Sequence, residues 1–385
     1  MLNNRWAILT LLIFVRLVMG FQFQAVASMT PFMVADLGLD FAEIGTLVGL
    51  YMLPGLVIAL PGAMLGSRFS DLTMVLFGVG VMAVGGVITG LADNFVMVGL
   101  GRLISGVGAV LQSLFMLKMV AEWFDEKSVT TAMAVLLCGW PVGIAIALTS
   151  LGPLAVVWNW QGVMHLTALT CLLALIAVWV GYRAPPGGQS VSKVGLRIQI
   201  PYREFVLVCY AGVVWAFYNL AYFSYLSFGP AMLIERGMDI AAAGAAISLA
   251  SWGALLGLPL GGFLADRTRR PGWVLTICCF LAALFAGTLP FVDFPFVLSA
   301  LTGLFAAAPA GIIMGRAVLL MSPPNRVQGN AILYTFFYGG LGLIPGVVGW
   351  TADVAGTAAA PIFLSAVILV LTVPLFLGQY LLSRD

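Results

Sequence analysis

Charged side chains are scarce in this chain. Asp, Glu, Lys and Arg make up 8% of its 385 residues, whereas 62% of the residues are apolar; a soluble domain carries about 25% charged residues. A soluble fold cannot cover so much apolar surface with so few ions, so most of the chain must lie in lipid. The net charge of +2 gives no reason to expect a nucleic-acid partner.

Residues that bind metals or act as nucleophiles are also few. His165 is the single histidine, and the five cysteines lie in apolar runs without metal-ligand spacing. No cluster of His, Cys and carboxylate residues is visible, which argues against an enzyme. A G-x-x-x-x-G-K-[ST] sequence is absent as well, which argues against ATP as the energy source. We therefore expect no cofactor and no metal.

Long apolar runs are abundant instead. A helix needs about 20 apolar residues to cross a bilayer. Twelve runs meet this need, at residues 6–34, 43–66, 73–92, 95–118, 129–151, 160–182, 204–233, 240–264, 272–291, 294–319, 327–352 and 358–381. The long polar segment at 183–203 divides them into two groups of six. The sequence predicts an all-α membrane protein with a six-helix bundle at 1–182, a cytoplasmic linker at 183–203 and a second bundle at 204–385.

The basic residues are distributed unevenly along this pattern. Lys and Arg concentrate in short cytoplasmic loops of membrane proteins. With the N-terminus inside, the outer loops carry Arg236 and two arginines lie within spans, Arg16 and Arg102. The inner segments carry Arg5, Arg68, Lys118, Lys127, Arg183, Lys193, Arg197, Arg203, Arg267, Arg269, Arg270, Arg316, Arg326 and Arg384. We therefore predict a multi-pass protein of the cell membrane with both termini in the cytoplasm.

The two halves resemble each other. "LISGVGAVLQSLFM" (103–116) is similar to "LTGLFAAAPAGIIM" (301–314), and Pro141 in the fifth span corresponds to Pro345 in the eleventh. A duplicated six-helix unit with a binding site between its copies is a known transporter arrangement. Chance similarity between helices rich in Gly and Ala is the alternative.

The loop "GGFLADRTRRPG" (261–272) follows the eighth span and contains Asp266 and Arg267. It resembles the G-x-L-A-D-R-x-G-R loop of the major facilitator superfamily. "GAMLGSRFSD" (62–71) is similar but weaker, because Arg68 is kept while Ser67 replaces the acid. The resemblance extends to "GRLISGVGA" (101–109), which contains Arg102, and to "CGWPVGIAI" (138–146).

This resemblance implies two pseudo-symmetric six-helix bundles that transport by alternating access. It also implies gating roles for Arg68, Asp266 and Arg267, whose charges can bridge neighbouring helix ends in one state and separate in another. Asp71 lies one helical turn from Ser67 and is a candidate replacement for the missing acid. Simple anchoring of positive charge at the cytoplasmic surface is the alternative.

Arg16 stands out because it lies inside the first span. An arginine at the centre of a spanning helix costs about 2.5–3.5 kcal/mol on insertion scales, so such residues face protein or water. Gly20 and Gln24 follow at i+4 and i+8, on the same helical face. All Asp and Glu residues lie near span ends, in loops or at the tail. Arg16 is therefore our candidate ligand for an anion; a structural partner or a snorkelling side chain are the alternatives.

Two further groups could add positive charge near a central cavity. Arg102 lies near the outer end of the fourth span, and His165 lies near the outer end of the sixth. Histidine titrates near neutral pH, so His165 is a candidate proton relay. A histidine satisfied at a helix interface is the alternative.

Aromatic residues recur on one face of the seventh span, at positions i, i+3, i+7 and i+10: Trp215, Tyr218, Tyr222 and Tyr225. Asn219 lies beside this face, and the eleventh span repeats the pattern with Tyr334 and Tyr338. Tyrosine hydroxyls need hydrogen-bond partners when buried in lipid, so we expect these faces to turn inward. Aromatic belts at the membrane surface are the alternative.

Together these features predict a secondary transporter, a monomer driven by a proton gradient or by exchange. Its substrate is predicted to be a small organic anion or zwitterion, bound by Arg16 and by hydrogen bonds from Gln24, Asn219, Tyr222, Tyr334 and Tyr338. Two alternatives stay open. One is an exporter of apolar drugs that uses the aromatic wall without Arg16, and the other is a membrane sensor that binds a ligand without transport.

Overall fold

The computed structural model describes residues 4–58, 69–125, 127–185, 200–322 and 325–382. The first half contains α1 (Arg5–Ser28), α2 (Thr30–Leu37), α3 (Phe41–Leu50), α5 (Asp71–Gly90), α6 (Phe95–Trp123) and α7 (Val129–Gly181). The second half contains α8 (Tyr202–Glu235), α9 (Ile240–Thr268), α10 (Pro271–Thr288), the short 3₁₀ helix η1 (Leu289–Phe291), α11 (Pro295–Ala307), α12 (Pro309–Leu319), α13 (Arg326–Leu343), α14 (Pro345–Ala355) and α15 (Ala360–Leu382).

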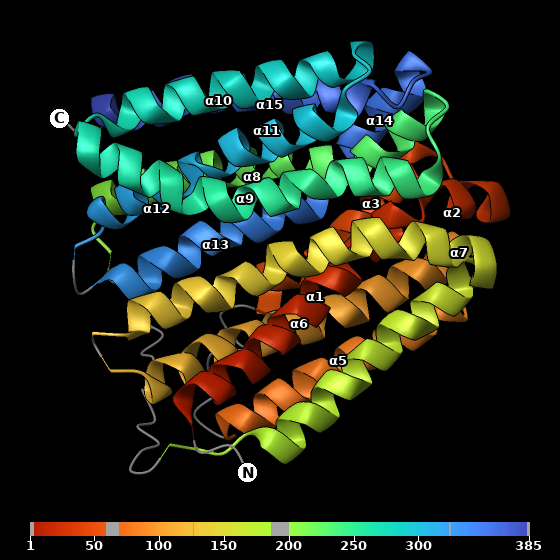
Figure 1. The fold of residues 1–385 in the computed structure, drawn as a ribbon. Helices are drawn as coiled ribbons and strands as arrows, with labels where there is room; N and C mark the ends of the chain where they lie inside the picture. The colour runs from red at the N-terminus through yellow and green to blue at the C-terminus, as the bar shows by residue number, and fades with distance from the viewer. Residues whose placement is uncertain (1–3, 59–68, 126, 186–199, 323–324, 383–385) are drawn as a thin grey trace.

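The number of membrane spans agrees with the sequence. Within the described ranges, eleven helical segments are long and apolar enough to cross a membrane. The longest, α7, contains two spans because Asn159 interrupts it with φ 57° and ψ 169°, and the ribbon folds back there (Figure 1). The Asn159 side-chain oxygen accepts a hydrogen bond from Gly162 N at 2.8 Å and so caps the returning helix. The prediction of twelve spans is confirmed.

Four of the predicted spans are interrupted where the sequence analysis treated them as continuous. In the run 43–66, α3 ends at Leu50 and the turn residues 51–53 precede a helix that resumes at Pro54. The run 6–34 divides into α1 and α2 just before Pro31, 294–319 divides at Pro309, and 327–352 divides at Pro345. Each proline lies in the first turn of the second helix. N–H groups in this turn have no partner within the helix, so a proline there costs no hydrogen bond. The boundary between the halves, predicted at 183–203, falls largely outside the described residues and stays a prediction.

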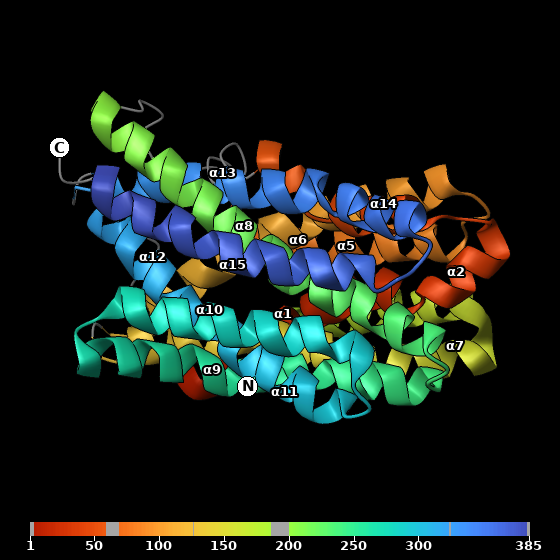
Figure 2. The same cartoon turned by 90° about the horizontal axis from the view of Figure 1, so that it is seen from above.

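The helices lie side by side along a common direction. The helices of the first half, coloured red to yellow-green, occupy the lower part of Figure 1, and most of the second half, green to blue, lies above them. We call the end where α1 begins and α15 ends the proximal end, and the end where α1 stops and α3 begins the distal end. Figure 2 again places α2 and the bend of α7 opposite α12.

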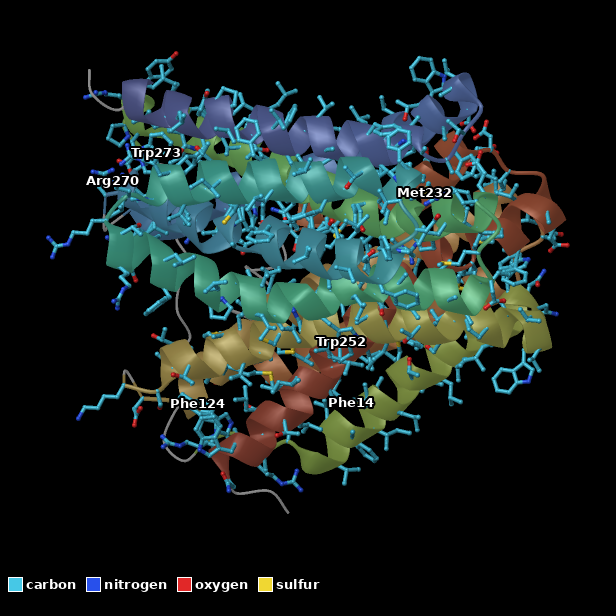
Figure 3. All side chains as sticks on the ribbon, turned by 45° about the horizontal axis from the view of Figure 1, so that its top comes forward. Phe14, Phe124, Met232, Trp252, Arg270 and Trp273 are labelled. Carbon is cyan, nitrogen blue, oxygen red and sulfur yellow. The ribbon has the colours of Figure 1, made fainter. Side chains whose placement is uncertain are left out.

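The described basic residues of the loops cluster at the proximal end. Arg270 and Trp273, which follow α9, lie at the same end as Phe124, which follows α6, whereas Met232 of α8 lies at the distal end (Figure 3). Arg236, at the C-terminus of α8, is at the distal end and pairs with Asp293 at 3.0 Å. The separation of charge seen in the sequence is therefore also a separation in space.

The two halves touch closely towards the distal end. Helix α3 packs along α14, and α7 packs along α9. At Gly349 and at Gly244 the backbones approach so closely that a Cβ would overlap the carbonyl oxygens of Phe41 and Leu148, respectively. Glycine permits this approach because it has no side chain to separate the helices. The distal end is therefore closed.

A carboxylate strengthens this closure. Asp353, near the end of α14 in the second half, accepts hydrogen bonds from the backbone N–H groups of Phe41 (2.9 Å) and Ala42 (2.8 Å) in the first half. The next N–H group, that of Glu43, donates to Asp40 at 2.7 Å. The N–H groups in the first turn of a helix have no partner within the helix, and this end has a partial positive charge. A carboxylate from another helix is therefore favourable there. The cap joins the halves and must break when the distal end opens.

We expect Asp353→Ala to favour opening of the distal end. Loss of a helix cap costs about 1 kcal/mol, which shifts a two-state equilibrium about fivefold. Ser227 of α8 is buried between the halves, so the maleimide labelling rate of Ser227→Cys, above the background of the native cysteines, reports this opening. Labelling of Cys at position 227 should be about fivefold faster in the double variant Asp353→Ala, Ser227→Cys than in Ser227→Cys alone.

Asp293→Ala is the matched control for this measurement, because Asp293 is also a distal carboxylate but pairs within the second half. It should leave the labelling rate unchanged. Equal labelling rates in the Asp353 and Asp293 variants would show that the cap does not hold the halves together.

Candidate functional site

A central cavity of about 470 Å³ lies between the two halves. The first half contributes α1, the segment after α3, α6 and α7, through Arg16, Met19, Met52, Ser113, Leu137, Trp140, Pro141 and Ile144. The second half contributes α8, α9, α12 and α13, together with Ala307 at the end of α11, and most of its lining side chains are aromatic or aliphatic. A cavity of this size accommodates a small molecule.

The cavity is accessible from the proximal end. Leu137 and Tyr334 line it and are exposed, and they lie in the proximal parts of α7 and α13. Leu258, in the proximal half of α9, is exposed as well. Together with the closed distal end, this exposure indicates that the cavity opens towards the proximal end.

Three aromatic rings close the distal side of the cavity. Phe223 of the second half packs on Phe23 at 5.5 Å and on Trp140 at 6.4 Å, measured between ring centroids. Phe23 and Trp140, both of the first half, lie 5.4 Å apart. Because Trp140 and Phe223 also line the cavity, the same rings form its wall and its distal barrier.

Arg16 lies on the cavity wall, as the sequence analysis expected. Its Nη1 donates a hydrogen bond to Ser113 Oγ at 2.9 Å, and its guanidinium carbon lies 5.1 Å from the centre of the Trp140 ring. Its buried Nε has no hydrogen-bond partner among the described residues. Ser113 thus binds the Nη1 edge of the guanidinium and Trp140 contacts its face, while the Nε–H group has no acceptor among the described residues.

No described acid neutralises this charge. Among the described residues that line the cavity, none is acidic. The ion pairs between described residues, such as Lys118 with Asp71 and Arg236 with Asp293, lie near helix ends. Arg16 therefore keeps a charge without a carboxylate partner in the described part of the chain.

The second-half wall contains four of the predicted contact residues. Asn219, Tyr222, Tyr334 and Tyr338 all line the cavity. Asn219 Nδ2 donates to the carbonyl of Trp215 at 2.8 Å, and the Tyr222 hydroxyl donates to the carbonyl of Ala250 at 3.3 Å. The structure thus brings Arg16 and these four side chains to one site, on opposite sides of the boundary between the halves.

Gln24 is not part of this site. It is buried, does not line the cavity, and donates from Nε2 to the carbonyl of Leu226 at 3.0 Å. Gln24 lies on the same face of α1 as Arg16, but about two helical turns nearer the distal end. There α8 covers this face of the helix. Its contact connects the two halves and belongs to the distal closure.

Arg102 lies outside the cavity as well, against the expectation that it adds positive charge there. Its three kinds of N–H group donate to the main-chain carbonyls of Leu47 (3.1 Å), Gln22 (2.9 Å) and Phe23 (2.9 Å). Its guanidinium carbon lies 4.5 Å from the centre of the Tyr51 ring. All of these partners belong to the first half, so Arg102 joins α1, α3 and α6 into one unit.

His165 does not reach the cavity either. It packs against Gly90 at the end of α5, within the first half, and does not line the cavity. Within the described residues it therefore lies apart from the site around Arg16. A relay through His165 therefore has no geometric support.

The predicted gating residues lie at the proximal end. Arg68 falls outside the described residues. Asp71 pairs with Lys118 of α6 at 2.9 Å, within the first half. Asp266 and Arg267 are exposed and form no ion pair with a described residue. Their gating roles stay predictions.

Two residues of the site have no signal in the sequence. Ser113 is a common small residue on a glycine-rich helix, and Trp140 looks like any aromatic residue beside a proline. The packing of α6 and α7 against α1 brings both to Arg16. The residues predicted from Arg16 and from the tyrosine periodicity therefore describe the site only in part.

Comparison with known proteins identifies the family. The sequence profile of the Major Facilitator Superfamily matches residues 12–234 and 213–384, which together cover most of the chain. The chain belongs to the Major Facilitator Superfamily. Similar members include the 3-(3-hydroxy-phenyl)propionate transporter of Escherichia coli strain K12, 25% identical over 82% of this chain and 79% of that protein. The hexuronate transporter of Bacillus subtilis strain 168 is 23% identical over 89% of this chain and 86% of that protein.

Other Major Facilitator Superfamily members extend these comparisons. The cis,cis-muconate transport protein of Acinetobacter baylyi is 24% identical over 83% of this chain and 81% of that protein. A bacterial homologue of the human lysosomal transporter Spinster, solved in an inward-facing and occupied conformation, superimposes with a TM-score of 0.77 at 18% identity, over 100% of this chain and 98% of that one. The family and fold predictions are confirmed, and the protein is a membrane transporter of small molecules rather than an enzyme.

In this superfamily member, Arg102→Ala should mainly reduce stability. The variant loses three hydrogen bonds from a charged group, each of which contributes about 1.5–3 kcal/mol, so purified protein should unfold several degrees lower in a fluorescence-monitored melt. Arg236→Ala, which removes an exposed distal arginine, is the control and should unfold close to the wild type. If Arg102→Ala melted normally but no longer transported, a gating role would replace this structural one.

Proposed function

We propose that this protein carries a small organic anion across the cell membrane by alternating access, with Arg16 as the ligand for the anionic group. The observation that supports this most directly is the unneutralised guanidinium on the wall of the central cavity. Its buried Nε–H lacks a partner among the described residues, and the described lining contains no acid. An anion would supply both the missing charge and the missing acceptor.

Energetics favours this role over a purely structural one. A central arginine costs about 2.5–3.5 kcal/mol in a spanning helix, and contact with one aromatic face returns about 0.5–2 kcal/mol. Arg102, in contrast, spends its N–H groups on carbonyls. The similar proteins named above are transporters of hydroxyphenylpropionate, hexuronate and muconate, each of which is a carboxylate.

The orientation follows from the charges. With the basic proximal end in the cytoplasm, the accessible side of the cavity faces inward, both termini are cytoplasmic and the distal closure faces outward. In the opposite state, Asp353 would leave α3 and the rings of Phe223, Phe23 and Trp140 would separate. Asp266 and Arg267, exposed here, are then placed to bridge helix ends at the closing proximal side. A monomer contains both halves of the site.

Exchange is the coupling mode that the site favours over proton symport. The described lining of the cavity contains no Asp, Glu or His to carry a proton. An empty carrier would have to reorient with an uncompensated guanidinium, whereas a loaded carrier reorients with a neutral pair. The return step is therefore expected to be fast only when a second anion is bound.

Arg16→Ala should abolish carboxylate transport while leaving the fold intact. In proteoliposomes, uptake of labelled 3-(3-hydroxyphenyl)propionate should fall at least about tenfold, the effect of losing about 1.4 kcal/mol of binding. Arg16→Lys should retain part of the activity, because lysine keeps the charge but loses the planar donor edge. Arg236→Ala, a distal arginine paired with Asp293, should transport normally.

Unchanged carboxylate uptake in Arg16→Ala, together with efflux of apolar drugs, would replace this proposal with that of a drug exporter. Binding without flux in every vesicle experiment would replace it with that of a sensor.

Exchange predicts stimulation from the opposite side of the membrane. Vesicles preloaded with unlabelled 3-(3-hydroxyphenyl)propionate should take up the labelled compound at least about fivefold faster than empty vesicles, because the return of the empty carrier bears the cost of the bare guanidinium. A pH gradient of about one unit should change the initial rate less than about twofold. Accumulation driven by that gradient in empty vesicles would instead show proton coupling.

A further inference from the structure

We propose that the substrate is a carboxylate with a flat aromatic body and a second hydrogen-bond acceptor, and that Trp215 determines this specificity by donating to that acceptor. The inference rests on the proposed function, because it takes the binding of the carboxylate at Arg16 as given. It adds the chemistry of the rest of the molecule, and a role for a residue of the second half.

The unpartnered polar atoms of the cavity are all donors. Among its described lining residues, the buried side-chain nitrogens and oxygens without a hydrogen-bond partner are Arg16 Nε, Trp140 Nε1 and Trp215 Nε1. Each carries a hydrogen and has no lone pair to accept with. Buried donors are normally satisfied. Unpartnered buried atoms also occur elsewhere in the described chain, but these three belong to residues of the cavity wall, so they are the donors for which a ligand in the cavity could supply acceptors.

These donors form two separate positions. Arg16 and Trp140 are adjacent on the first half, with the guanidinium 5.1 Å from the indole ring. Trp215 is on α8 of the second half. One carboxylate can occupy the first position, and a different oxygen of the same molecule must serve the second. The ligand therefore bridges the two halves.

The wall between these positions favours a flat apolar body. Trp215 stacks on Tyr218 at 5.7 Å and on Phe337 at 6.3 Å, with 27° between the ring planes in both pairs. Tyr334 and Tyr338 continue this aromatic surface from α13. Rings of this kind stack offset on a further ring at similar spacings. An aromatic substrate thus gains contact along the whole second-half wall.

The same wall disfavours a sugar acid. A hexuronate has several hydroxyl groups, and each brings a hydrogen that needs an acceptor once it leaves water. The Tyr218, Tyr222 and Asn219 side chains that line this wall already donate to main-chain carbonyls, so only their oxygens are left to accept. Apart from the Tyr334 and Tyr338 hydroxyls, the rest of the described wall is mainly hydrocarbon, so the wall has fewer acceptors than a hexuronate has hydroxyl hydrogens. A carboxylate with one or two acceptor oxygens matches the donors without leaving its own hydrogens unpaired.

The test measures affinity for a matched series of ligands with purified full-length protein. The probes are 3-phenylpropionate, its 3-methoxy and 4-methoxy derivatives, and glucuronate. The methoxy oxygen accepts but cannot donate. We expect one methoxy isomer to bind at least fivefold more tightly than 3-phenylpropionate, and glucuronate to bind at least tenfold more weakly than that isomer.

Trp215→Phe keeps the ring and removes the Nε1 donor. The advantage of the methoxy isomer should disappear in this variant, while the affinity for 3-phenylpropionate stays within about twofold of the wild type, a result that a merely unfolded variant cannot give. Trp252→Phe is the matched control, because Trp252 is an exposed residue of α9 outside the cavity (Figure 3). It should preserve the whole affinity series.

The outcomes separate this inference from the proposal on which it rests. Equal binding of glucuronate and the methoxy compounds by the wild type, or an equal loss for every ligand in Trp215→Phe, would overturn the role of Trp215 while Arg16 is still required. Unchanged binding of all four probes in Arg16→Ala would overturn the anion carrier itself.

Discussion

The organisation of the central cavity depends on one charge, that of Arg16, which no acid of the described lining balances. Ser113 and Trp140 contact one edge and one face of the Arg16 guanidinium, which lowers the cost of its burial without ending its need for an anion. The cavity, its aromatic wall and the closed distal end all surround this group. In a low-dielectric interior an unpaired charge interacts strongly with any counter-ion that arrives, so in the proposed carrier a single side chain would provide most of the selectivity for charge.

Arg16 and Arg102 show why sequence alone cannot assign such a charge. Both are arginines within apolar spans, yet Arg102 is satisfied by carbonyls near the ends of α1 and α3. Whether carbonyl oxygens of other helices lie within reach of an arginine depends on how those helices pack, which a periodicity argument does not locate. The difference between a structural and a functional arginine is set by the backbone of other helices, not by the residues beside it.

The spans, by contrast, could be predicted because bilayer thickness fixes their length and composition. The breaks at Pro31, Pro309 and Pro345 were missed because apolar content continues through them. In the site, the tyrosine periodicity placed Tyr222 and Tyr338 on the cavity because one helical face meets one environment. The same reasoning failed for Gln24, since the face it shares with Arg16 is covered by α8 two turns further on.

In the proposed carrier, binding and gating would share side chains, and occupancy could move the halves through them as follows. Trp140 contacts the Arg16 guanidinium on one side and Phe223 and Phe23 on the other. An anion that draws the guanidinium towards the cavity shifts the surface on which Trp140 rests, and with it the ring contact that closes the distal side. Helix α13, with Tyr334 and Tyr338, continues into α14, whose Asp353 caps α3. A ligand that touches both walls therefore acts on both distal contacts at once, and one that touches a single wall does not.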